Sequence, residues 1–408
     1  MAEDLKTKMD LLDLMDLKSV NFIQNLFREY YVEELSLDTT GLKVDNREFG
    51  FISFEGSMVR HMSFKTVKEL VAFIQNFVPR DAYFSCAYYG NPMAEMEKKG
   101  WLGADLIFDI DADHIPTPCN KIHDEWVCCN CGFSGKGITP QNCPICHGEK
   151  FETSTWICQD CLDTAKNEAI KLLDVLREDF GFSNKDMHVY FSGHRGYHIH
   201  IENELVQSLD AISRKEIVDY LCGIGFNQKI TGSASWYARI RKRLHHFISN
   251  AFEEDFARLG LKKNVVRVLV NNRGKILTNL ERAEAWKSVK GIGPESWEKI
   301  LDHCAKDEFV KIDTVVTADI HRLVRLPNTL HGKTGFKKVE FSISQIDDFD
   351  PLKEAIAFKK GTVKVFVYNS PQFRVREETF GPYKNVRVEL PTAAAVLLIC
   401  KGKAEVSL

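Results

Sequence analysis

Acidic and apolar residues alternate in the segment Leu106–Asp113. In an extended strand, successive side chains point to opposite faces, so Asp109, Asp111 and Asp113 would share one face while the apolar residues between them pack into the core. Neighbouring carboxylates repel each other unless a cation neutralises them, and their hard oxygen ligands suit Mg²⁺ or Mn²⁺. Two-metal nucleotidyl transfer needs such a pair to activate a hydroxyl and to stabilise the leaving pyrophosphate. Taken alone, the motif is also compatible with a solvated acidic strand end.

A second group of chemically active residues is the cysteine-rich stretch between positions 119 and 161. Two Cys-x-x-Cys pairs separated by a glycine-containing loop are typical of a zinc ribbon, namely Cys128 with Cys131 and Cys143 with Cys146. The set that flanks this ribbon would close a second tetrahedral site, formed by Cys119, His123, Cys158 and Cys161. Four protein ligands leave no position open for water, so zinc at either site would be structural. Cys129 has no obvious partner and could replace Cys128 or Cys131 in a different partition.

Basic and hydrogen-bonding residues gather in the segment Tyr190–His200, which leaves an apolar strand, passes two glycines and returns to an alternating strand. Glycine permits a tight bend or a close approach of the backbone to a ligand. His194, Arg195 and His198 surround the bend and offer donors and positive charge suited to a triphosphate. A hairpin with incidental basic residues is the alternative.

The downstream segment Asp313–Gly335 combines acids with a donor-rich loop shaped by glycines and a proline. Its basic residues are Arg322, Arg325, His331 and Lys333. A carboxylate beside such a loop can complete a metal site whose nucleotide the loop holds, and either Asp313 or Asp319 could be that acid. For the two arginines, a solvated helix face is the alternative interpretation.

Periodicity predicts the elements that must position these residues. The sequence contains both strand-like and helical patterns, which indicates a mixed α/β fold. Periodicity is lost in the cysteine-rich stretch, as expected for an insertion held together by bound metal. We expect residues 1–114, 163–204 and 306–408 to form the core, 115–162 to form a zinc-binding insertion, and 205–305 to form a mostly helical, partly basic subdomain.

Composition limits the class of protein. The 408 residues are 44% hydrophobic and 27% charged, which argues against long disordered regions. The N-terminus lacks the apolar run of a signal peptide, and the apolar stretch Ala393–Cys400 is far shorter than the roughly 20 residues needed to cross a bilayer. We therefore expect a cytoplasmic protein without membrane contact. In a reducing cytosol, the twelve cysteines favour metal binding over a disulfide framework.

Nucleic-acid binding would require a local basic face, because the net charge of −3 provides no general attraction. The segment from Trp236 to Arg273 contains nine lysines and arginines but only three acids. The interleaved Trp236, Tyr237 and Phe247 could add base stacking, as in single-strand binding. A solvated helical face is an equally simple interpretation of these charges.

Taken together, the segments resemble the catalytic small subunit of archaeal and eukaryotic DNA primase, over a span from about Arg47 to Gly335. The resemblance rests on their order, which is Asp-Ile-Asp, the cysteine and histidine block, Ser-Gly-His-Arg-Gly-Tyr-His, and Arg-Leu-Val-Arg-Leu-Pro-Asn-Thr-Leu-His-Gly-Lys-Thr-Gly. The sequence of the last motif is similar to that of archaeal members of the family. The fold implied is the archaeo-eukaryotic primase fold, an α+β arrangement with an RRM-like catalytic sheet, an inserted zinc module and a helical subdomain.

The resemblance also implies roles for individual residues. The catalytic metal ligands fall on Asp109, Asp111 and Asp313, the last because it precedes the Arg-Leu loop as in the family. The contacts to the nucleotide fall on Ser192, His194, Arg195, His198, Arg325, His331 and Lys333, although eukaryotic members usually carry a second arginine at the position of His194. The zinc knuckle of the family matches the outer cysteine and histidine set, and the ribbon looks like an insertion into it.

The activity implied is synthesis of short RNA primers, and possibly DNA primers, from nucleoside triphosphates on a single-stranded DNA template. Resemblance also implies a heterodimer with a large, iron-sulfur-containing primase subunit. Two alternatives remain open at this point. One is a primase-polymerase serving repair or plasmid replication, and the other is a non-catalytic, zinc-dependent nucleic-acid-binding subunit.

Overall fold

Two four-stranded antiparallel sheets build the core of the protein. The structure is a computed structural model that describes residues 16–37, 42–225, 234–282 and 289–407. Its contacts divide the chain into a first unit (residues 1–170, 182–215 and 312–408) and a second unit (residues 171–181 and 216–311). The mixed α/β fold expected from the periodicity is confirmed.

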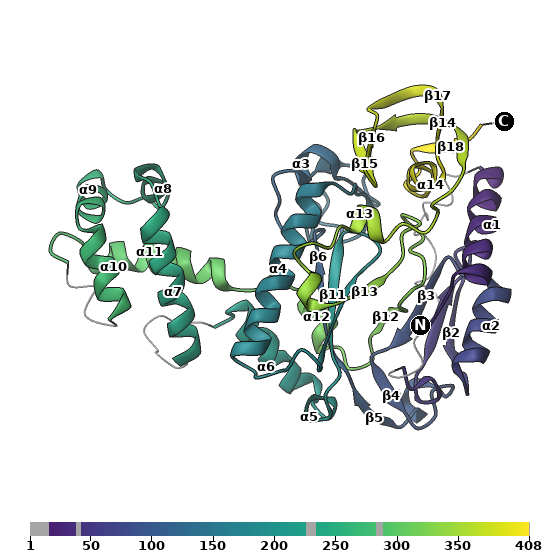
Figure 1. Ribbon diagram of the computed structural model, residues 1–408, viewed down its shortest axis with the longest axis horizontal. Coiled ribbons are helices and arrows are strands. Elements are labelled where there is room, and N and C mark those ends of the chain that lie inside the picture. The colour runs from purple at the N-terminus through teal and green to yellow at the C-terminus, as the bar shows by residue number, and fades with distance from the viewer. Residues whose placement is uncertain (1–15, 38–41, 226–233, 283–288, 408) are drawn as a thin grey trace. The chain divides into compact units, whose positions relative to one another are not determined.

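The first sheet has the order β12-β3-β1-β2 and is formed by β1 (Phe49–Ile52), β2 (Met58–Met62), β3 (Asp81–Ser85) and β12 (Leu323–Arg325). Beside it lie α1 (Leu17–Glu33) and α2 (Val67–Phe77), as Figure 1 shows. Aromatic contacts such as Phe51 with Phe73, at 4.8 Å between ring centroids, join sheet and helix.

The second sheet has the order β13-β10-β11-β6 and is formed by β6 (Leu106–Asp111), β10 (Met187–Phe191), β11 (Gly196–Ile201) and β13 (Val339–Phe341). On β6, Phe108 and Ile110 are fully buried while Asp109 and Asp111 are partly exposed. This alternation is what a strand with one core face produces, because its side chains point in turn to opposite sides. The acids therefore project from one face of a buried strand.

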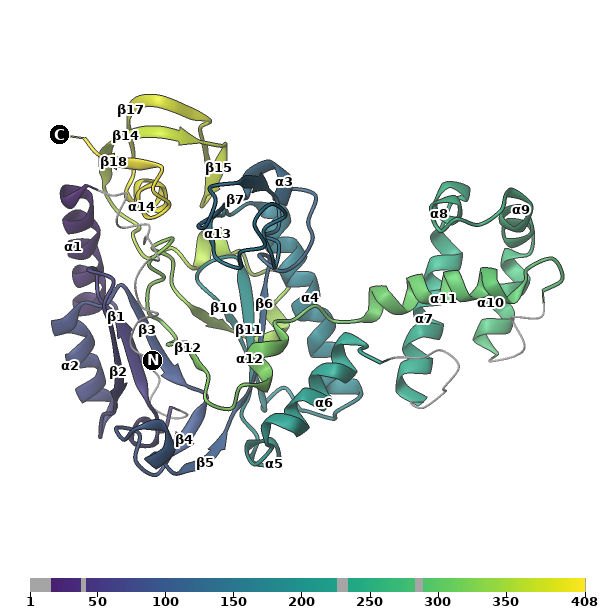
Figure 2. The same ribbon diagram turned by 180° about the vertical axis from the view of Figure 1, so that it is seen from behind.

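A third sheet near the C-terminus has the order β17-β14-β18 and is formed by β14 (Thr362–Ser370), β17 (Tyr383–Pro391) and β18 (Ala404–Val406). The helix α14 (Thr392–Cys400) packs against it, and all nine of its residues are buried (Figure 2). The chain leaves this helix at Lys401, which is also buried. Among the described residues, no helix has the length and hydropathy needed to cross a membrane.

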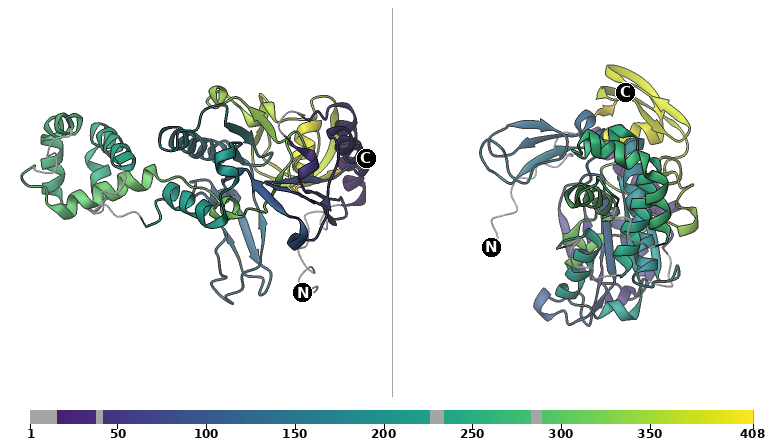
Figure 3. Two further views of the ribbon diagram at one scale, coloured as in Figure 1. Left: turned by 90° about the horizontal axis from the view of Figure 1, so that it is seen from below. Right: turned by 90° about the vertical axis from the view of Figure 1, so that its left-hand side faces the viewer.

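The cysteine-rich stretch folds as a small three-stranded sheet of order β8-β7-β9, preceded by the short helix α3 (Asn120–His123). Its strands are β7 (Glu125–Cys128), β8 (Ser134–Lys136) and β9 (Phe151–Ser154), and Figure 3 shows them projecting from the rest of the first unit. Trp126 is the main apolar contact of this module. A Cβ atom at Gly135 would lie 2.3 Å from the Trp126 ring, so only glycine fits there.

The second unit is helical and includes α7 (Ala234–Asn250), α8 (Glu253–Arg258), α9 (Lys263–Asn271), α10 (Arg273–Glu281) and α11 (Pro294–Glu308). Trp236 belongs to its hydrophobic core, and Phe247 packs against that core. The expectation that Trp236 stacks on bases is therefore wrong, because its ring is buried in the helical bundle. Phe247 is only partly buried, and base stacking by its ring stays a prediction. The side chain of Tyr237 lies outside the described residues.

Candidate active site

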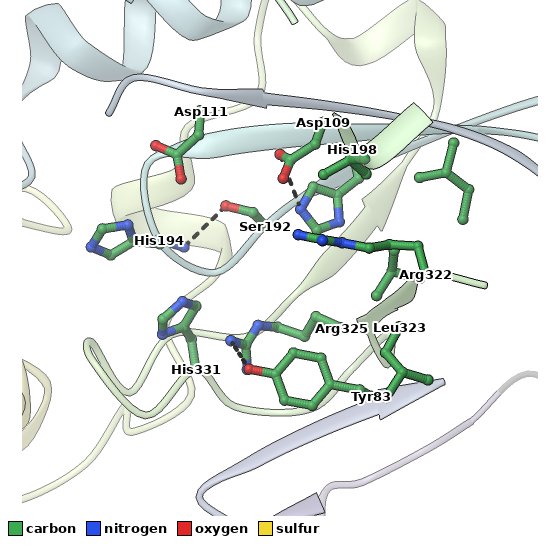
Figure 4. Close-up of a pocket in the computed structure, with 13 residues that line it drawn as sticks. Tyr83, Asp109, Asp111, Ser192, His194, His198, Arg322, Leu323, Arg325 and His331 are labelled. Carbon is green, nitrogen blue, oxygen red and sulfur yellow. Dashed lines mark hydrogen bonds and ion pairs between the residues drawn. The ribbon is translucent and has the colours of Figure 1, made fainter. Parts of the chain in front are cut away.

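Three carboxylates meet at the end of β6. Asp109 and Asp111 project into a pocket of about 180 Å³ between the two four-stranded sheets (Figure 4). The backbone N–H of Asp313 donates to the carbonyl oxygen of Asp109 at 2.8 Å, which brings this distant part of the chain beside the strand. The Asp313 carboxylate caps α12 (Thr314–Ala318) by accepting from the backbone N–H of Val315 at 2.9 Å. The fold thus gathers three acids from two segments.

Asp319, the other acid in the downstream segment, occupies a different position. Its carboxylate accepts from the backbone N–H of His321 at 2.9 Å, at the far end of α12. The charges that act on Asp109 come from Asp111 and Asp313, with an opposing contribution from Arg322. The structure therefore places Asp313, and not Asp319, beside the pair on β6.

The two acids on β6 both resist ionisation. Burial, followed by the charges of Asp111 and Asp313, raises the pKa of Asp109 to about 8. Burial and the charge of Asp113 raise the pKa of Asp111 to about 6. A cluster of oxygen ligands that resists ionisation by itself is the donor set that a hard divalent cation satisfies, because the cation supplies the missing positive charge. The residues present therefore fit Mg²⁺ or Mn²⁺.

We expect Asp109→Asn to stabilise the protein when no divalent cation is added. The folded-state pKa of about 8 exceeds the roughly 3.9 of an exposed aspartate, so the free energy of unfolding falls as the pH rises between these values. Asparagine removes this penalty. The variant should gain roughly 2 kcal/mol at pH 8 and almost nothing at pH 4 in thermal unfolding experiments. A lower unfolding midpoint than wild type at pH 8 would contradict this account, and Asp319→Asn is the matched control.

The strand β11 supplies the neighbours of the acids. His198 is the cross-strand partner of Asp109, with 3.5 Å between its Nε2 and the Asp109 Oδ1. Gly196 is the partner of Asp111, and a Cβ atom at this glycine would lie 2.2 Å from the carbonyl oxygen of Ile110. No side chain fits at this position. At Gly196 the close approach of the backbone is to the neighbouring strand and not to a ligand.

The bend between β10 and β11 is closed by a side chain. The Ser192 hydroxyl accepts from the backbone N–H groups of His194 at 3.3 Å and Gly196 at 3.2 Å. Gly193 has a φ of +85°, which favours glycine. The bend is therefore fixed internally, and it presents Ser192 and His194 to the pocket.

Two histidines from distant loops stack on each other. The rings of His194 and His331 lie 5.1 Å apart between centroids with an interplanar angle of 21°. The Thr334 hydroxyl donates to the carbonyl oxygen of Gly193 at 2.6 Å and joins the two loops. Burial, and then nearby positive charge, holds the pKa of both histidines well below its ordinary value, so both rings are neutral near pH 7.

Arg325 and Asp81 position the loop that carries His331. The Arg325 guanidinium donates to Asp81 at 2.7 Å, and the same carboxylate accepts from the backbone N–H of Gly332 at 2.9 Å. A Cβ atom at Gly332 would lie 2.5 Å from the Arg80 side chain. Arg325 lines the pocket, yet its charge already has a partner. Lys333 is exposed and is not among the residues that line the pocket.

Arg195 does not reach the pocket, contrary to the expectation that it contacts the nucleotide. Its side chain is 1% exposed and donates to Asp124 at 2.9 Å, to Asp113 and to the carbonyl oxygen of Trp156 at 2.9 Å. The alternation of β11 explains the difference, because His198 faces the acids while the bend turns Arg195 toward the cysteine-rich module. The structure therefore assigns Arg195 to the support of the site.

The cysteines converge in two groups of four donors. The donor atoms within each group all lie within 4.8 Å of one another, and the groups are Cys119, His123, Cys158 and Cys161, and Cys128, Cys131, Cys143 and Cys146. Sulfur separations of 3.4 Å for Cys119–Cys161 and 3.7 Å for Cys131–Cys143 approach the edge of about 3.8 Å of a tetrahedron with Zn–S bonds of about 2.3 Å. All twelve cysteines are free thiols, and Cys129 is exposed outside both groups. Both groups therefore fit zinc.

A second layer of contacts joins the outer zinc group to the acids. His123 Nδ1 lies 2.7 Å from Asp124 Oδ1, an arrangement that orients a metal-bound histidine. Asp124 in turn binds Arg195, which binds Asp113 next to Asp111. Sequence spacing could not reveal this chain of contacts.

Sequence reasoning also missed two residues at the site. Tyr83 lines the pocket from β3, and Lys401 contacts His194 from near the C-terminal end of the sequence, 207 positions away. Tyr83 belongs to none of the sequence motifs, so no sequence signal pointed to it. The available signal for Lys401 was a single cation directly after an apolar run, at a place where a buried helix ends.

Comparison with known proteins identifies a sequence family. Residues 147–343 match the family described as DNA primase small subunit. The chain is 36% identical to the DNA primase small subunit PriS of Archaeoglobus fulgidus over 94% of this chain and 97% of that protein. It is 31% identical to the protein of the same name from Nitrosopumilus maritimus, over 96% of this chain and 100% of that protein. The PriS protein of Methanococcoides burtonii is 33% identical over 96% of this chain and 99% of that protein.

Proposed function

Because the chain belongs to the family of archaeal DNA primase small subunits, we propose that the pocket between its two sheets is where primers are made. The protein is a DNA-directed nucleotidyltransferase that synthesises RNA primers for DNA replication. The match over nearly the full length favours this function over a repair enzyme or a non-catalytic binding subunit. The observation that carries the assignment of the site is that Asp109 and Asp111 line one pocket together with Ser192, His194, His198 and His331, while Asp313 lies beside Asp109.

Asp109, Asp111 and Asp313 would hold the divalent cation or cations, Mg²⁺ or Mn²⁺. When bound, such ions lower the pKa of an attacking 3′-hydroxyl and neutralise charge on the leaving pyrophosphate. The carboxylates that would bind the ions are already in place. Strand β6 fixes Asp109 and Asp111, and the backbone hydrogen bond to Asp109 fixes Asp313. This pre-organisation reduces the reorganisation needed during reaction.

The nucleotide would contact the donors that face the acids. Ser192, His194 and His331 line the side of the pocket near Asp111, where they can orient phosphate oxygens. His198 lies beside Asp109, nearer the reacting end, and Arg322 offers positive charge across from it. Arg325 acts mainly through the loop that it positions. Lys333 stands at the exposed side of the same loop and could reach only an extended triphosphate.

Each cysteine group would bind one structural zinc ion, for a total of two per chain. We expect purified protein to contain about two zinc ions by elemental analysis. Cys128→Ser with Cys146→Ser should remove one ion and leave the stability of the remaining protein nearly unchanged, because the ribbon projects from the first unit. Cys119→Ser with Cys158→Ser should remove the other and lower the unfolding midpoint. Equal effects of the two double variants would contradict this distinction.

Single-stranded DNA and the large subunit complete the proposed assembly. In the second unit, Arg239 and Arg243 are already paired with acids. Basic residues that form no ion pair with the described side chains are Arg241, Lys242, Lys262, Lys263 and Arg267, and these are the proposed phosphate contacts. The family name implies a large-subunit partner, which we propose to be the iron-sulfur-containing subunit, acting on DNA in the archaeal cytoplasm.

The experiment that tests the function is incorporation of labelled nucleotides on unprimed single-stranded DNA with Mg²⁺ or Mn²⁺. Template-dependent product from the wild-type protein, alone or with the large subunit, is the expected result. Binding of the template without any incorporation in the presence of the large subunit would instead support a non-catalytic binding subunit.

A further inference from the structure

Lys401 is a buried cation behind the pocket. It follows α14, whose residues are all buried, and its side chain is 6% exposed. Its Nζ lies 2.7 Å from Nε2 of His194, although the two residues are 207 positions apart. Among the residues that the structure describes, Lys401 forms no ion pair.

A purely structural role does not account for this lysine. Burying an ammonium group without a carboxylate partner costs free energy, and an apolar residue like those of α14 would fill the space without that cost. Burial, followed by the charges of Lys333 and Arg195, lowers the pKa of Lys401 to about 7. An anion bound nearby would offset this cost, and a nucleoside triphosphate is such an anion.

The contact also fixes the chemistry of His194. When Lys401 is protonated, as a bound anion favours, its ammonium group has only donors. Nε2 of His194 then accepts, and the proton of the neutral ring resides on Nδ1. His194 lines the pocket and is held by stacking on His331. The Nδ1–H group is therefore the one ring donor that His194 can offer to a ligand.

We propose that Lys401 is a positioning residue for nucleotide binding, which fixes the Nδ1–H tautomer of His194 so that this ring donates to a phosphate oxygen of the incoming nucleotide. This inference rests on the proposed function of the pocket. The positive charge behind the ring strengthens the same interaction, since it lies on the side of the pocket that holds His194 and His331.

The test compares Lys401→Met with Lys403→Met, a lysine two positions downstream that contacts no described residue of the pocket. We expect Lys401→Met to raise the KM for nucleotide about ten- to hundredfold, the effect of losing one hydrogen bond to a charged group, with a smaller change in kcat. Lys401→Arg should restore part of the affinity. Adding Lys401→Met to His194→Gln should have little further effect, because the lysine acts through the histidine.

A second measurement is made on the wild-type protein and does not depend on the folding of Lys401→Met. Nitrogen-15 NMR of histidine-labelled wild-type protein, with His194 assigned by the His194→Gln variant, should show a protonated Nδ1 and an unprotonated Nε2. A protonated Nε2 in the wild type, or an unchanged KM in Lys401→Met, would overturn the inference while leaving the primase assignment intact. Absence of incorporation by the wild type with the large subunit would instead overturn the proposed function.

Discussion

Replacing Asp109, Asp111 or Asp313 by asparagine should reduce primer synthesis by about 10³-fold or more, because each substitution removes an anionic ligand from the proposed cation site. The substitutions keep the size of the side chain and remove only charge, so fold and zinc content should be retained. Template binding should also persist, since the phosphate contacts proposed for the template lie in the second unit. Initial rates of nucleotide incorporation on unprimed single-stranded DNA, measured over a range of Mg²⁺ and Mn²⁺ concentrations, provide the test.

The matched control is Asp319→Asn, which changes an acid in the same segment that does not face Asp109. We expect this variant to keep most of its activity. Loss of activity in Asp319→Asn together with a normal rate in Asp313→Asn would show that the third ligand had been assigned to the wrong acid. Normal activity in all three variants would remove the carboxylates from the mechanism.

Arg195→Ala should destabilise the protein by about 3–5 kcal/mol, which is the range observed when one partner of a buried ion pair is removed. The Arg195 guanidinium binds Asp113 and Asp124 together, and its side chain is almost fully buried. Without it, the buried Asp124 carboxylate loses its guanidinium partner and keeps only the donors of His123, Asn120 and the Trp156 backbone. Urea-induced unfolding followed by circular dichroism measures this loss, and elemental analysis should show weaker retention of zinc at the outer site.

Arg195→Lys is the informative control. A lysine keeps the charge and lacks the planar fork that can bind two carboxylates at once, so we expect an intermediate loss of stability. If Arg195 instead contacted the nucleotide, Arg195→Ala would raise the KM for nucleotide and leave the urea midpoint unchanged. The two roles are therefore separable by measuring stability and KM on the same variant.

The contacts around Arg195 connect the outer zinc group to the acids of the proposed active site. His123 orients Asp124, Asp124 holds Arg195, and Arg195 binds Asp113 in the turn that follows the acids of β6. Loss of zinc at this site should therefore disturb the position of Asp111. Among the described residues, the four ribbon cysteines form no hydrogen bond with Asp124, Arg195 or Asp113, which is why we expect removal of the ribbon zinc to have a smaller effect.

Several features of the protein were determined by local sequence pattern. The alternation in Leu106–Asp113 predicted a strand with acids on one face, and β6 has that arrangement because a half-buried strand must alternate. The Cys-x-x-Cys spacing predicted the same two groups of four donors that the fold brings together. Such patterns succeed where neighbours in sequence are also neighbours in space.

Other features depended on contacts between distant segments, which local spacing does not reveal. Spacing alone leaves Asp313 and Asp319 equivalent; the family resemblance favours Asp313, and the structure supplies the physical reason, a backbone hydrogen bond to Asp109. The direction of Arg195 depends on how the bend closes, and the burial of Trp236 depends on how the helices of its unit pack. Lys401 contacts His194 over a separation of 207 positions, because α14 ends where the bend between β10 and β11 passes. A residue's type and period indicate which face it occupies, whereas its partner is set by packing that the local sequence does not encode.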